Sequence, residues 1–477
     1  MKTLKINEED NVAVVIDPGE SGITAGHKVA LTDIKAGEKI IKYGNCIGTA
    51  TEDIKKGDWV HTHNVKTALE GQKDYSYEPV AAPTFPKREL FFNGYKRKNG
   101  RAGIRNDVYI IPTVGCVGKI AENIAKKASR FVTSDEIEVI ALSHPYGCSQ
   151  LGDDQDNTRQ ILADLILHPN VGGVLVLSLG CENSNLSTIK PLLKGMDEDR
   201  VKFLVCQESE DEVADGVEIV KGLIKLAESE KRVKVPADEL VVGLKCGGSD
   251  GFSGITANPT VGRFSDLLTA AGGTTILTEV PEMFGAEHLL MNRCETKELF
   301  DKTVSLINDF KDYFISHGQV VYENPSPGNK AGGITTLEDK SLGCTQKSGK
   351  SAVKGVLKYG ERVETKGLNL LSAPGNDLVA ATALAASGAQ LVLFTTGRGT
   401  PFASPVPTLK ISSNSALAAH KKNWIDFNAG VVLEGMTLEE TGDLLLSLVL
   451  EVASGKRVKS ELAGLYDMAV FKNGVTL

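Results

Sequence analysis

The segment VYIIPTVGCVGKIAENIAKKASR, residues 108–130, is the stretch that decides the fold class of this chain. It starts with an apolar run, passes through a turn that contains Gly115 and Cys116, and ends in an amphipathic stretch at 120–130. A short buried run, a glycine turn and a helical period in this order are typical of a strand–turn–helix unit. When such units alternate along a chain, they predict a parallel sheet covered by helices on both faces.

The same unit recurs on the C-terminal side of this segment. Glycine-rich turns follow most of the strand-like runs, so functional side chains are expected at the carboxyl ends of the strands. A further α/β stretch extends from Gly273 to the C-terminus. The expected strands beyond 108–112 are 139–142, 174–177, 202–206 and 240–244, and the clearest further helix is 211–228.

Residues 1–72 have a different texture and predict a small β module. Short strand-like runs alternate there with turn signals at close spacing, which is typical of a compact β unit. Two segments of this module are near copies, LTDIKAGEKI at 31–40 and TEDIKKGDWV at 51–60. This internal duplication predicts two equivalent strand–turn–strand elements.

The remainder of the chain divides at a polar, proline-containing segment. Residues 73–95 hold no sustained hydrophobic period and are expected to form a linker. With roughly 150 residues per domain, the 477-residue chain has room for about three domains. We therefore expect a first α/β subdomain at 96–235 and a second at 236–477 after the β module.

Charge and cysteine content limit the functional classes. The chain has 61 acidic residues against 53 Lys and Arg, a net charge of −8, which argues against nucleic-acid and anionic-membrane partners. The N-terminus lacks the apolar core of a secretory signal, and no apolar run reaches the length of a membrane helix. Eight cysteines without a CxxC pair predict reduced thiols in the cytoplasm and no zinc knuckle.

Five of these cysteines lie next to glycines, mostly in turns that follow apolar runs, and such turns allow a ligand to approach closely. Thiolate, imidazole and carboxylate groups that converge at strand ends would suit Fe(II), Mn(II) or Zn(II). The alternative is that these cysteines only pack near the strand ends, and spacing alone gives no ligand set. The five are Cys116, Cys148, Cys181, Cys246 and Cys344, whereas Cys46, Cys206 and Cys294 look like packing residues. The candidate metal ligands are His144, Cys148, Cys181, Glu182 and Cys246.

Two histidines, His61 and His63, lie two positions apart in WVHTHNVKT. If the strand expected at 59–61 continues through them, both imidazoles share one face and can converge on a ligand. The alternative is a pair of polar residues on the solvent face of an edge strand.

Two segments are candidates for binding an anion. The basic segment 96–105 contains Arg101 and Arg105, whose guanidinium groups match a carboxylate; the alternative is a solvated loop. The glycine-rich segment after Cys246 contains Ser249 and Asp250 and could hold a phosphate or carboxylate through its amides. It matches neither the P-loop nor the GxGxxG pattern, which weakens an ATPase or NAD-dehydrogenase interpretation.

Several charged residues in glycine-rich loops are candidates for proton transfer or substrate binding. Glu279 and Glu282 flank Pro281, Lys330 lies in ENPSPGNKAGG, and Arg398 follows an apolar strand. Each of them alone is more often a solvated loop charge than a catalytic group.

Several longer strings of the chain form a recognisable set of motifs. They include PTVGCV (112–117), YGCSQLGDD (146–154), LGCEN (179–183), CGGSDG (246–251) and TTGRGTP (395–401). Taken together, the motifs resemble those of the altronate/galactarate dehydratase family along essentially the whole chain. The resemblance implies an N-terminal SAF-type β-clip module followed by a large catalytic part with Rossmann-like parallel sheets. It also implies dehydration of D-altronate to 2-dehydro-3-deoxy-D-gluconate in hexuronate catabolism, with a divalent metal, Fe(II) ahead of Mn(II).

Such a dehydration needs three things from the chain. The proton on the carbon next to an ionised carboxylate is very weakly acidic. A metal or cations must therefore stabilise the developing enediolate while a base removes the proton. The departing hydroxyl needs a general acid or the metal. We assign substrate binding to Arg101, Arg105, Ser249, Asp250 and Arg398, and proton transfer to His61, His63, Glu279 and Lys330.

Two alternatives to this function remain open from the sequence. On the same scaffold, the enzyme could be a lyase for galactarate or sulfolactate. From another class, it could be a non-catalytic protein that binds a small sugar acid. A homo-oligomer is compatible with either.

Overall fold

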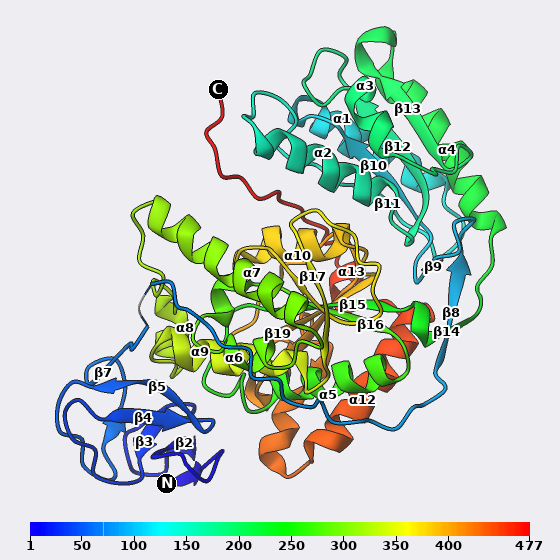
Figure 1. The fold of residues 1–477 in the computed structure, drawn as a ribbon. Helices are drawn as coiled ribbons and strands as arrows, with labels where there is room; N and C mark the ends of the chain where they lie inside the picture. Colours follow the sequence, from blue (N-terminus) through cyan, green and yellow to red (C-terminus); the bar gives the residue numbers. More distant parts are fainter. Residues whose placement is uncertain (70) are drawn as a thin grey trace.

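A small antiparallel module, a four-stranded parallel sheet and a seven-stranded parallel sheet follow one another along the chain (Figure 1). The structure is a computed structural model and describes residues 1–69 and 71–477. It is a mixed α/β protein, as predicted, because the buried strands alternate with helices from residue 107 onward. None of the helices in the described ranges is both long enough and apolar enough to cross a membrane.

The N-terminal module, residues 1–69, consists of two small antiparallel sheets. The two near-copies meet across a bridge in which Ile34 and Ile54 exchange backbone hydrogen bonds of 2.8 Å. Their side chains pair reciprocally, Lys35 with Asp53 and Lys55 with Asp33, so the predicted duplication is visible in space. One sheet holds β1 (Lys2–Leu4), β2 (Val12–Asp17), β3 (Lys28–Ala30) and β6 (Trp59–Val60); the other holds β4 (Lys39–Lys42), β5 (Asn45–Ala50) and β7 (Val65–Lys66).

A connecting segment without helices or strands, residues 71–90, leads from this module along the larger sheet's domain (Figure 1). It is held by the Tyr77 hydroxyl, which donates to the Cys294 carbonyl at 2.8 Å. The chain then enters a three-stranded antiparallel sheet between the two α/β parts, with β8 (Phe91–Lys96) between β9 (Ala102–Gly103) and β14 (Val233–Pro236).

The smaller parallel sheet has the strand order β11-β10-β12-β13. Helices α1 and α4 pack together on one face, and α2 covers the other. The expected strands and helices appear within a few residues of their predicted bounds. They are β10 (Asp107–Pro112), α1 (Gly118–Ala128), β11 (Val139–Ala141), β12 (Val171–Ser178), β13 (Val201–Val205) and α4 (Glu212–Ser229). Helix α2 (Asp153–Ile166) was not among the expected elements.

The larger parallel sheet has the order β17-β18-β16-β15-β19-β20-β21. Helices α5 and α12 pack against each other over one face, and the apolar helix α10 lies on the other face, where it also contacts α2. The strands are β15 (Val241–Cys246), β16 (Thr274–Leu277), β17 (Val353–Leu357), β18 (Gly367–Leu371), β19 (Leu391–Thr396), β20 (Thr408–Ser412) and β21 (Phe427–Asn428). The principal helices are α5 (Ala257–Ala270), α7 (Lys297–Ser316), α8 (Pro327–Ala331), α9 (Leu337–Cys344), α10 (Asp377–Ala386) and α12 (Leu438–Ala453).

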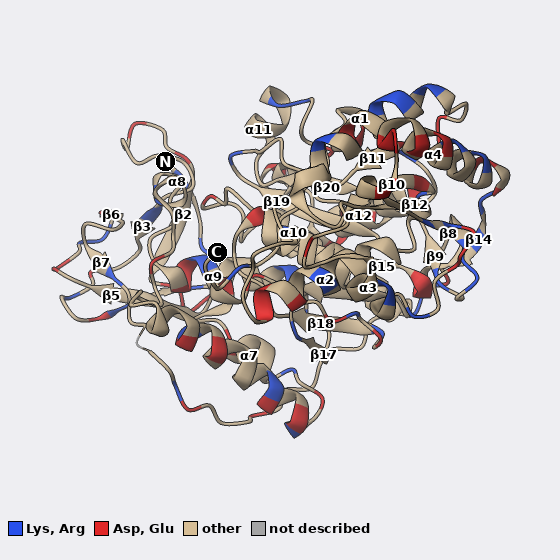
Figure 2. Cartoon of the chain, turned by 90° about the horizontal axis from the view of Figure 1, so that it is seen from above, with Lys and Arg blue, Asp and Glu red and all other residues tan. Residues whose placement is uncertain are grey.

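The segment 473–477 returns to the smaller sheet. The Asp154 carboxylate accepts hydrogen bonds from the amides of Asn473 and Gly474 at 2.7 and 2.6 Å, and the Leu477 amide donates to the Ser149 carbonyl. On the outer helices α4 and α7, acidic and basic residues both occur along the chain (Figure 2), so these helices form no concentrated basic field.

Candidate functional site

The candidate site lies where the strand order of the larger sheet reverses. From β15 the chain builds toward β16, β18 and β17 on one side and toward β19, β20 and β21 on the other. In an open parallel sheet, this switch point at the carboxyl ends of the strands is where ligands bind. Cys246 is the last residue of β15, and Glu279 follows β16 by two positions.

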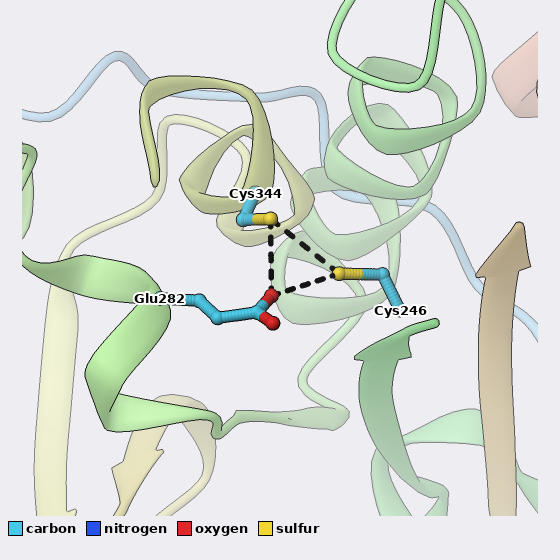
Figure 3. Close-up of side chains that lie close together, drawn as sticks. All are labelled: Cys246, Glu282 and Cys344. Carbon is cyan, nitrogen blue, oxygen red and sulfur yellow. Dashed lines mark hydrogen bonds between the residues drawn. The ribbon is translucent and has the colours of Figure 1, made fainter. Parts of the chain in front are cut away.

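Two thiols and a carboxylate form a closed triangle at this point (Figure 3). The Sγ atoms of Cys246 and Cys344 lie 3.3 and 3.2 Å from Glu282 Oε2 and 3.5 Å from each other. All three residues are buried, and they come from the end of β15, a turn after β16 and the end of α9. Within residues 1–69 and 71–477, they are the only group of three potential metal ligands whose atoms lie within 4.8 Å of one another.

Three buried lysines surround this triangle. Lys340 Nζ lies 2.8 Å from Glu282 Oε1, and Lys347 Nζ lies 2.8 Å from Cys246 Sγ and 3.1 Å from Glu279 Oε2. Lys245 forms ion pairs with Glu279 and Asp377. Burial opposes ionisation of Glu282, but the ammonium groups of Lys340, Lys245 and Lys347 outweigh it and lower its pKa to about 2.

The charges of this cluster match a divalent cation. Three carboxylates are balanced by three ammonium groups, which leaves the two thiols to set the net charge. The hydrogen bond with Cys246 and burial raise the pKa of Cys344, so this thiol keeps its proton when no cation is bound. A divalent cation that replaces thiol protons offsets the negative charge of the thiolates that it binds. Thiolates and a carboxylate are donors that Fe(II) and Zn(II) accept, so the residues present fit a metal.

Glu279 adopts a backbone conformation that is rare for a residue with a side chain. Its φ is +68°, in the left-handed region. The conformation directs its carboxylate back to the Cys246 amide, whose N–H donates to Oε2 at 3.0 Å. Strain of this kind costs about 1–3 kcal/mol and is concentrated at functional sites.

The N-terminal module is joined to this site by buried charges. Asp339 on α9 accepts hydrogen bonds from Lys28 and Lys42 of the module at 2.8 and 2.9 Å. Burial opposes ionisation of Asp339, but the two ammonium groups outweigh it and hold its pKa far below the usual range. α9 therefore carries both a module contact and, at its last residue, the site thiol Cys344.

The predicted strand face of His61 and His63 is wrong. β6 ends at Val60, and the residues that follow form a turn in which the Asn64 amide donates to the His61 carbonyl. His61 is buried and its Nε2–H donates to the Lys330 carbonyl of α8 at 2.9 Å, whereas His63 is exposed. Burial lowers the pKa of His61. The Trp59 ring lies about equally far from both imidazoles, 5.1 and 5.0 Å.

Three predicted residues lie near α8, at the edge of the buried triangle. Lys340, which pairs with Glu282, also donates to Asn329 Oδ1 of α8 at 3.2 Å. The Asn329 side chain donates from Nδ2 to the Ser249 carbonyl at 2.8 Å, and the Ser249 hydroxyl is buried without a hydrogen-bond partner among the described residues. Arg398 reaches the Gly328 carbonyl. Ser249, Lys330 and Arg398 are thus connected to Glu282 through Lys340 and α8.

Three other predicted substrate residues are already occupied or lie elsewhere. Asp250 accepts hydrogen bonds from Ser253, Ser413 and Asn414, which stabilise the glycine-rich turn. The buried Arg105 guanidinium binds Glu461 in a bidentate manner, so it has no free face for a carboxylate. Arg101 lines a separate cavity together with residues at the start of β15 and of β16.

Four of the five predicted metal ligands lie on the smaller sheet, away from Cys246. His144 is held by both ring nitrogens: Nε2–H donates to the Pro112 carbonyl at 2.7 Å and Nδ1 accepts from the Tyr146 amide. Burial lowers its pKa to about 4. The Glu182 carboxylate accepts from Thr113, Ser178 and Gly180. Cys148 and Cys181 are exposed, so the predicted five-residue ligand set does not come together.

Sequence reasoning missed most partners of Cys246. Glu282 was considered as a candidate for proton transfer and not as a metal ligand, and Cys344 was flagged beside a glycine but lies at the end of a helix. Lys245 and Lys347 gave no sequence signal, because a lone lysine in an apolar strand or a short turn resembles a surface residue.

Comparison with known proteins gives the family. Three family models match the chain. The model described as "D-galactarate/Altronate dehydratase, C-terminal" matches residues 237–476, and the model described as "D-galactarate dehydratase/Altronate hydrolase, second domain" matches residues 94–228. The model described as "Altronate/galactarate dehydratase SAF domain" matches residues 18–68. The chain is 53% identical to the altronate dehydratase of Bacillus subtilis over 99% of both chains. It is 50% identical to that of Escherichia coli over the full length of both. It is 35% identical to the galactarate dehydratase (L-threo-forming) of Escherichia coli over 98% of this chain and 96% of that one. The chain therefore belongs to the altronate/galactarate dehydratase family.

Proposed function

We propose that this protein is a hydro-lyase that dehydrates D-altronate to 2-dehydro-3-deoxy-D-gluconate. The observation that carries the proposal is the buried Cys246–Glu282–Cys344 triangle at the switch point, in a chain 50–53% identical to two altronate dehydratases along its whole length. The lower identity to the galactarate dehydratase, 35%, favours altronate over galactarate. The reversed strand order about β15 supports the Rossmann-like arrangement expected for the catalytic part.

We assign the metal to Cys246, Glu282 and Cys344 and propose Fe(II) as the ion. Two thiolates make the site soft, which favours Fe(II) over Mn(II). When bound, the metal supplies a Lewis acid that stabilises negative charge on substrate oxygens. Lys340 fixes the Glu282 carboxylate through Oε1 and leaves Oε2 directed at the two thiols. Such support of a ligand maintains its orientation and affinity for the metal.

The substrate is proposed to approach from the α8 side. The Ser249 hydroxyl, which has no partner among the residues that the structure describes, offers a donor and an acceptor to a sugar-acid hydroxyl, and Arg398 offers a guanidinium to the carboxylate. Both oxygens of Glu279 are engaged by Lys245 and Lys347. We therefore propose that Glu279 positions these ammonium groups, where they oppose the negative charge of the enediolate. Proton removal at C2 is left to Lys330 or His63.

The test combines substrate and metal. Protein purified anaerobically is assayed for 2-keto acid release from altronate, galactarate and sulfolactate, with Fe(II) added and then chelated. We expect turnover of altronate that Fe(II) supports and chelation removes. Fe(II)-dependent release from galactarate or sulfolactate but not from altronate would replace the proposed substrate. Tight altronate binding without release would instead indicate a binding protein.

A pair of variants tests the substrate side. Ser249→Ala should raise KM for altronate about tenfold, as expected for the loss of one hydrogen bond of 1–1.5 kcal/mol. Ser253→Ala, in the same turn but bonded to Asp250, is the matched control. An unchanged KM in Ser249→Ala would place the substrate elsewhere.

A further inference from the structure

Three exposed thiols lie outside the site described above, on the carboxyl edge of the smaller sheet. Cys116 follows β10, Cys148 follows β11 and Cys181 follows β12, and each comes directly after a glycine. In the sheet, β10 lies between β11 and β12, so the three cysteine turns are neighbours at one edge. All three thiols are free and exposed, and the chemistry proposed at Cys246 uses none of them.

The three turns are packed on one another. The Gly115 amide donates to the Tyr146 carbonyl at 2.9 Å, and the Ser184 amide donates to the Gly147 carbonyl at 3.0 Å. Gly147 has a φ of +102°, and a side chain there would lie 2.0 Å from the Thr113 carbonyl oxygen. Only glycine permits this approach, so the turn that carries Cys148 is fitted against the turn that precedes Cys116.

Buried polar side chains stabilise the three cysteine turns through hydrogen bonds on their inner side. His144 joins the end of β10 to the Cys148 turn, because it binds both the Pro112 carbonyl and the Tyr146 amide. Glu182 joins Thr113, also after β10, to the Gly180 amide in the Cys181 turn. The buried polar groups are therefore used internally, while the thiols face outward. A site whose first contacts are held by a second set of hydrogen bonds is preorganised for a ligand.

Side-chain amides contact two of the three sulfurs. Cys148 Sγ donates to Asn183 Oδ1 at 3.2 Å, and this oxygen also accepts from the Ser149 amide at 3.0 Å. Gln207 Nε2 donates to Cys181 Sγ at 3.3 Å. Hydrogen bonds to cysteine sulfur are among the means by which proteins adjust iron–sulfur centres.

We propose that Cys116, Cys148 and Cys181 together bind a [4Fe–4S] cluster. Thiolate ligands select Zn, Cu(I) or iron–sulfur centres. A single zinc ion would hold its sulfurs within about 4 Å of one another. In the described part of the chain, these three thiols do not form a group that close. A cluster binds each thiolate to a different iron, so it accepts a wider spacing. Three thiolates leave the fourth iron open to a non-protein ligand.

The binding step can be tested without any change of oxidation state. A synthetic [4Fe–4S] cluster that carries small-thiolate ligands exchanges them for protein thiols. Three iron–sulfur bonds to the small thiolates break and three to cysteine form, while each cysteine proton passes to a departing thiolate. The cluster keeps its iron, sulfide and electrons throughout.

The experiment incubates the full chain with this synthetic cluster under anaerobic conditions and then removes the excess. The cluster should add about four irons and four acid-labile sulfides per chain, with the visible absorption of a cluster. The triple variant C116S/C148S/C181S should bind at least tenfold less sulfide than the wild type. Cys206→Ser is the matched control, because Cys206 follows β13 at the same edge but is partly buried, and it should retain the cluster. Circular dichroism of each variant checks the fold.

Three outcomes would overturn the proposal: equal sulfide in the triple variant and the wild type, one metal ion bound without sulfide, or loss of sulfide with Cys206→Ser. The variant C246S/C344S separates this result from the proposed dehydratase site. It should retain sulfide while it loses the single Fe(II), and the triple variant should do the reverse. Either site can therefore fail without the other.

Discussion

The buried thiol pair on the larger sheet and the three exposed thiols on the smaller sheet differ in what surrounds the sulfur. Cys246 and Cys344 face a carboxylate and lysine ammonium groups inside the protein. Cys148 and Cys181 face neutral amides, and Cys116 is likewise exposed. A cysteine beside a glycine therefore has no fixed role; neighbouring charges and burial determine which metal chemistry it can support.

The largest expected effect follows removal of the buried pair. C246S/C344S should lose Fe(II) retention and at least about a thousandfold in turnover, because a metal contributes several kcal/mol of transition-state stabilisation. Iron content after desalting and 2-keto acid release measure both. The control is Cys294→Ser, another buried thiol, which contacts Thr303 rather than the triangle. Normal iron retention in the double variant would remove the distinction between the two thiol groups.

Thiol labelling measures the difference in burial directly. In metal-free protein, iodoacetamide should modify Cys116, Cys148 and Cys181 about a hundredfold faster than Cys246 and Cys344. The buried thiols react only after local opening, and about 3 kcal/mol of opening free energy gives this ratio. Peptide mapping by mass spectrometry follows each site. Similar rates for the two groups would show that the triangle is open to solvent.

The stability of the cysteine turns, to which the hydrogen bonds of His144 contribute, should depend on pH. The pKa of His144 is lowered to about 4 by burial, whereas the unfolded chain binds the proton near pH 6.5. The contribution of His144 to the free energy of unfolding is thus fully present above pH 6.5. It is lost as the pH falls toward 4, by up to about 3 kcal/mol. Hydrogen exchange of the β10 and β12 amides reports it.

A matched variant isolates His144 from the other histidines. His144→Gln should reduce this pH dependence but not abolish it, because burial also lowers the pKa of His168 in the same domain, to about 3. His420→Gln changes an exposed histidine and should leave the profile as it is. An identical profile in His144→Gln would mean that His144 does not support the turns.

The smallest effect concerns one hydrogen bond to an exposed sulfur. Gln207→Leu removes the hydrogen bond that Gln207 Nε2 donates to Cys181 Sγ. The rate of Cys181 alkylation at neutral pH should fall about threefold, consistent with a bond of about 0.5–1 kcal/mol. Cys148 in the same sample is the internal reference. A rise in the Cys181 rate would indicate that Gln207 shields the sulfur instead.

Much of the fold could be predicted from the sequence, because its signals are local. The run at 108–112, the turn after it and the helix at 120–130 are neighbours in sequence and in space. The duplicated segments of the N-terminal module likewise predicted two equivalent elements, and in the structure these elements pair reciprocally. Local periodicity also placed several cysteines at strand ends, which is where the structure has them.

The composition of the site could not be predicted in the same way. Cys246 meets Glu282 and Cys344 across separations of 36 and 98 residues, and nothing in the local pattern specifies those pairs. The predicted ligands His144 and Glu182 failed for a different reason. Their polar groups are consumed by backbone amides and carbonyls of the turns, and only coordinates reveal that competition. Arg105 was assigned to the substrate carboxylate, but in the structure its guanidinium binds the Glu461 carboxylate.

The return of residues 473–477 to the smaller sheet joins parts of the chain that are far apart in sequence, and this affects the order of folding. Asp154 binds amides 319 and 320 positions later, and Leu477 binds Ser149, next to Cys148. Contacts of such long sequence separation form slowly, since a large loop must close first. The thiol edge is therefore expected to reach its final form among the last steps of folding, after both sheets are in place, and to open among the first under mild denaturant.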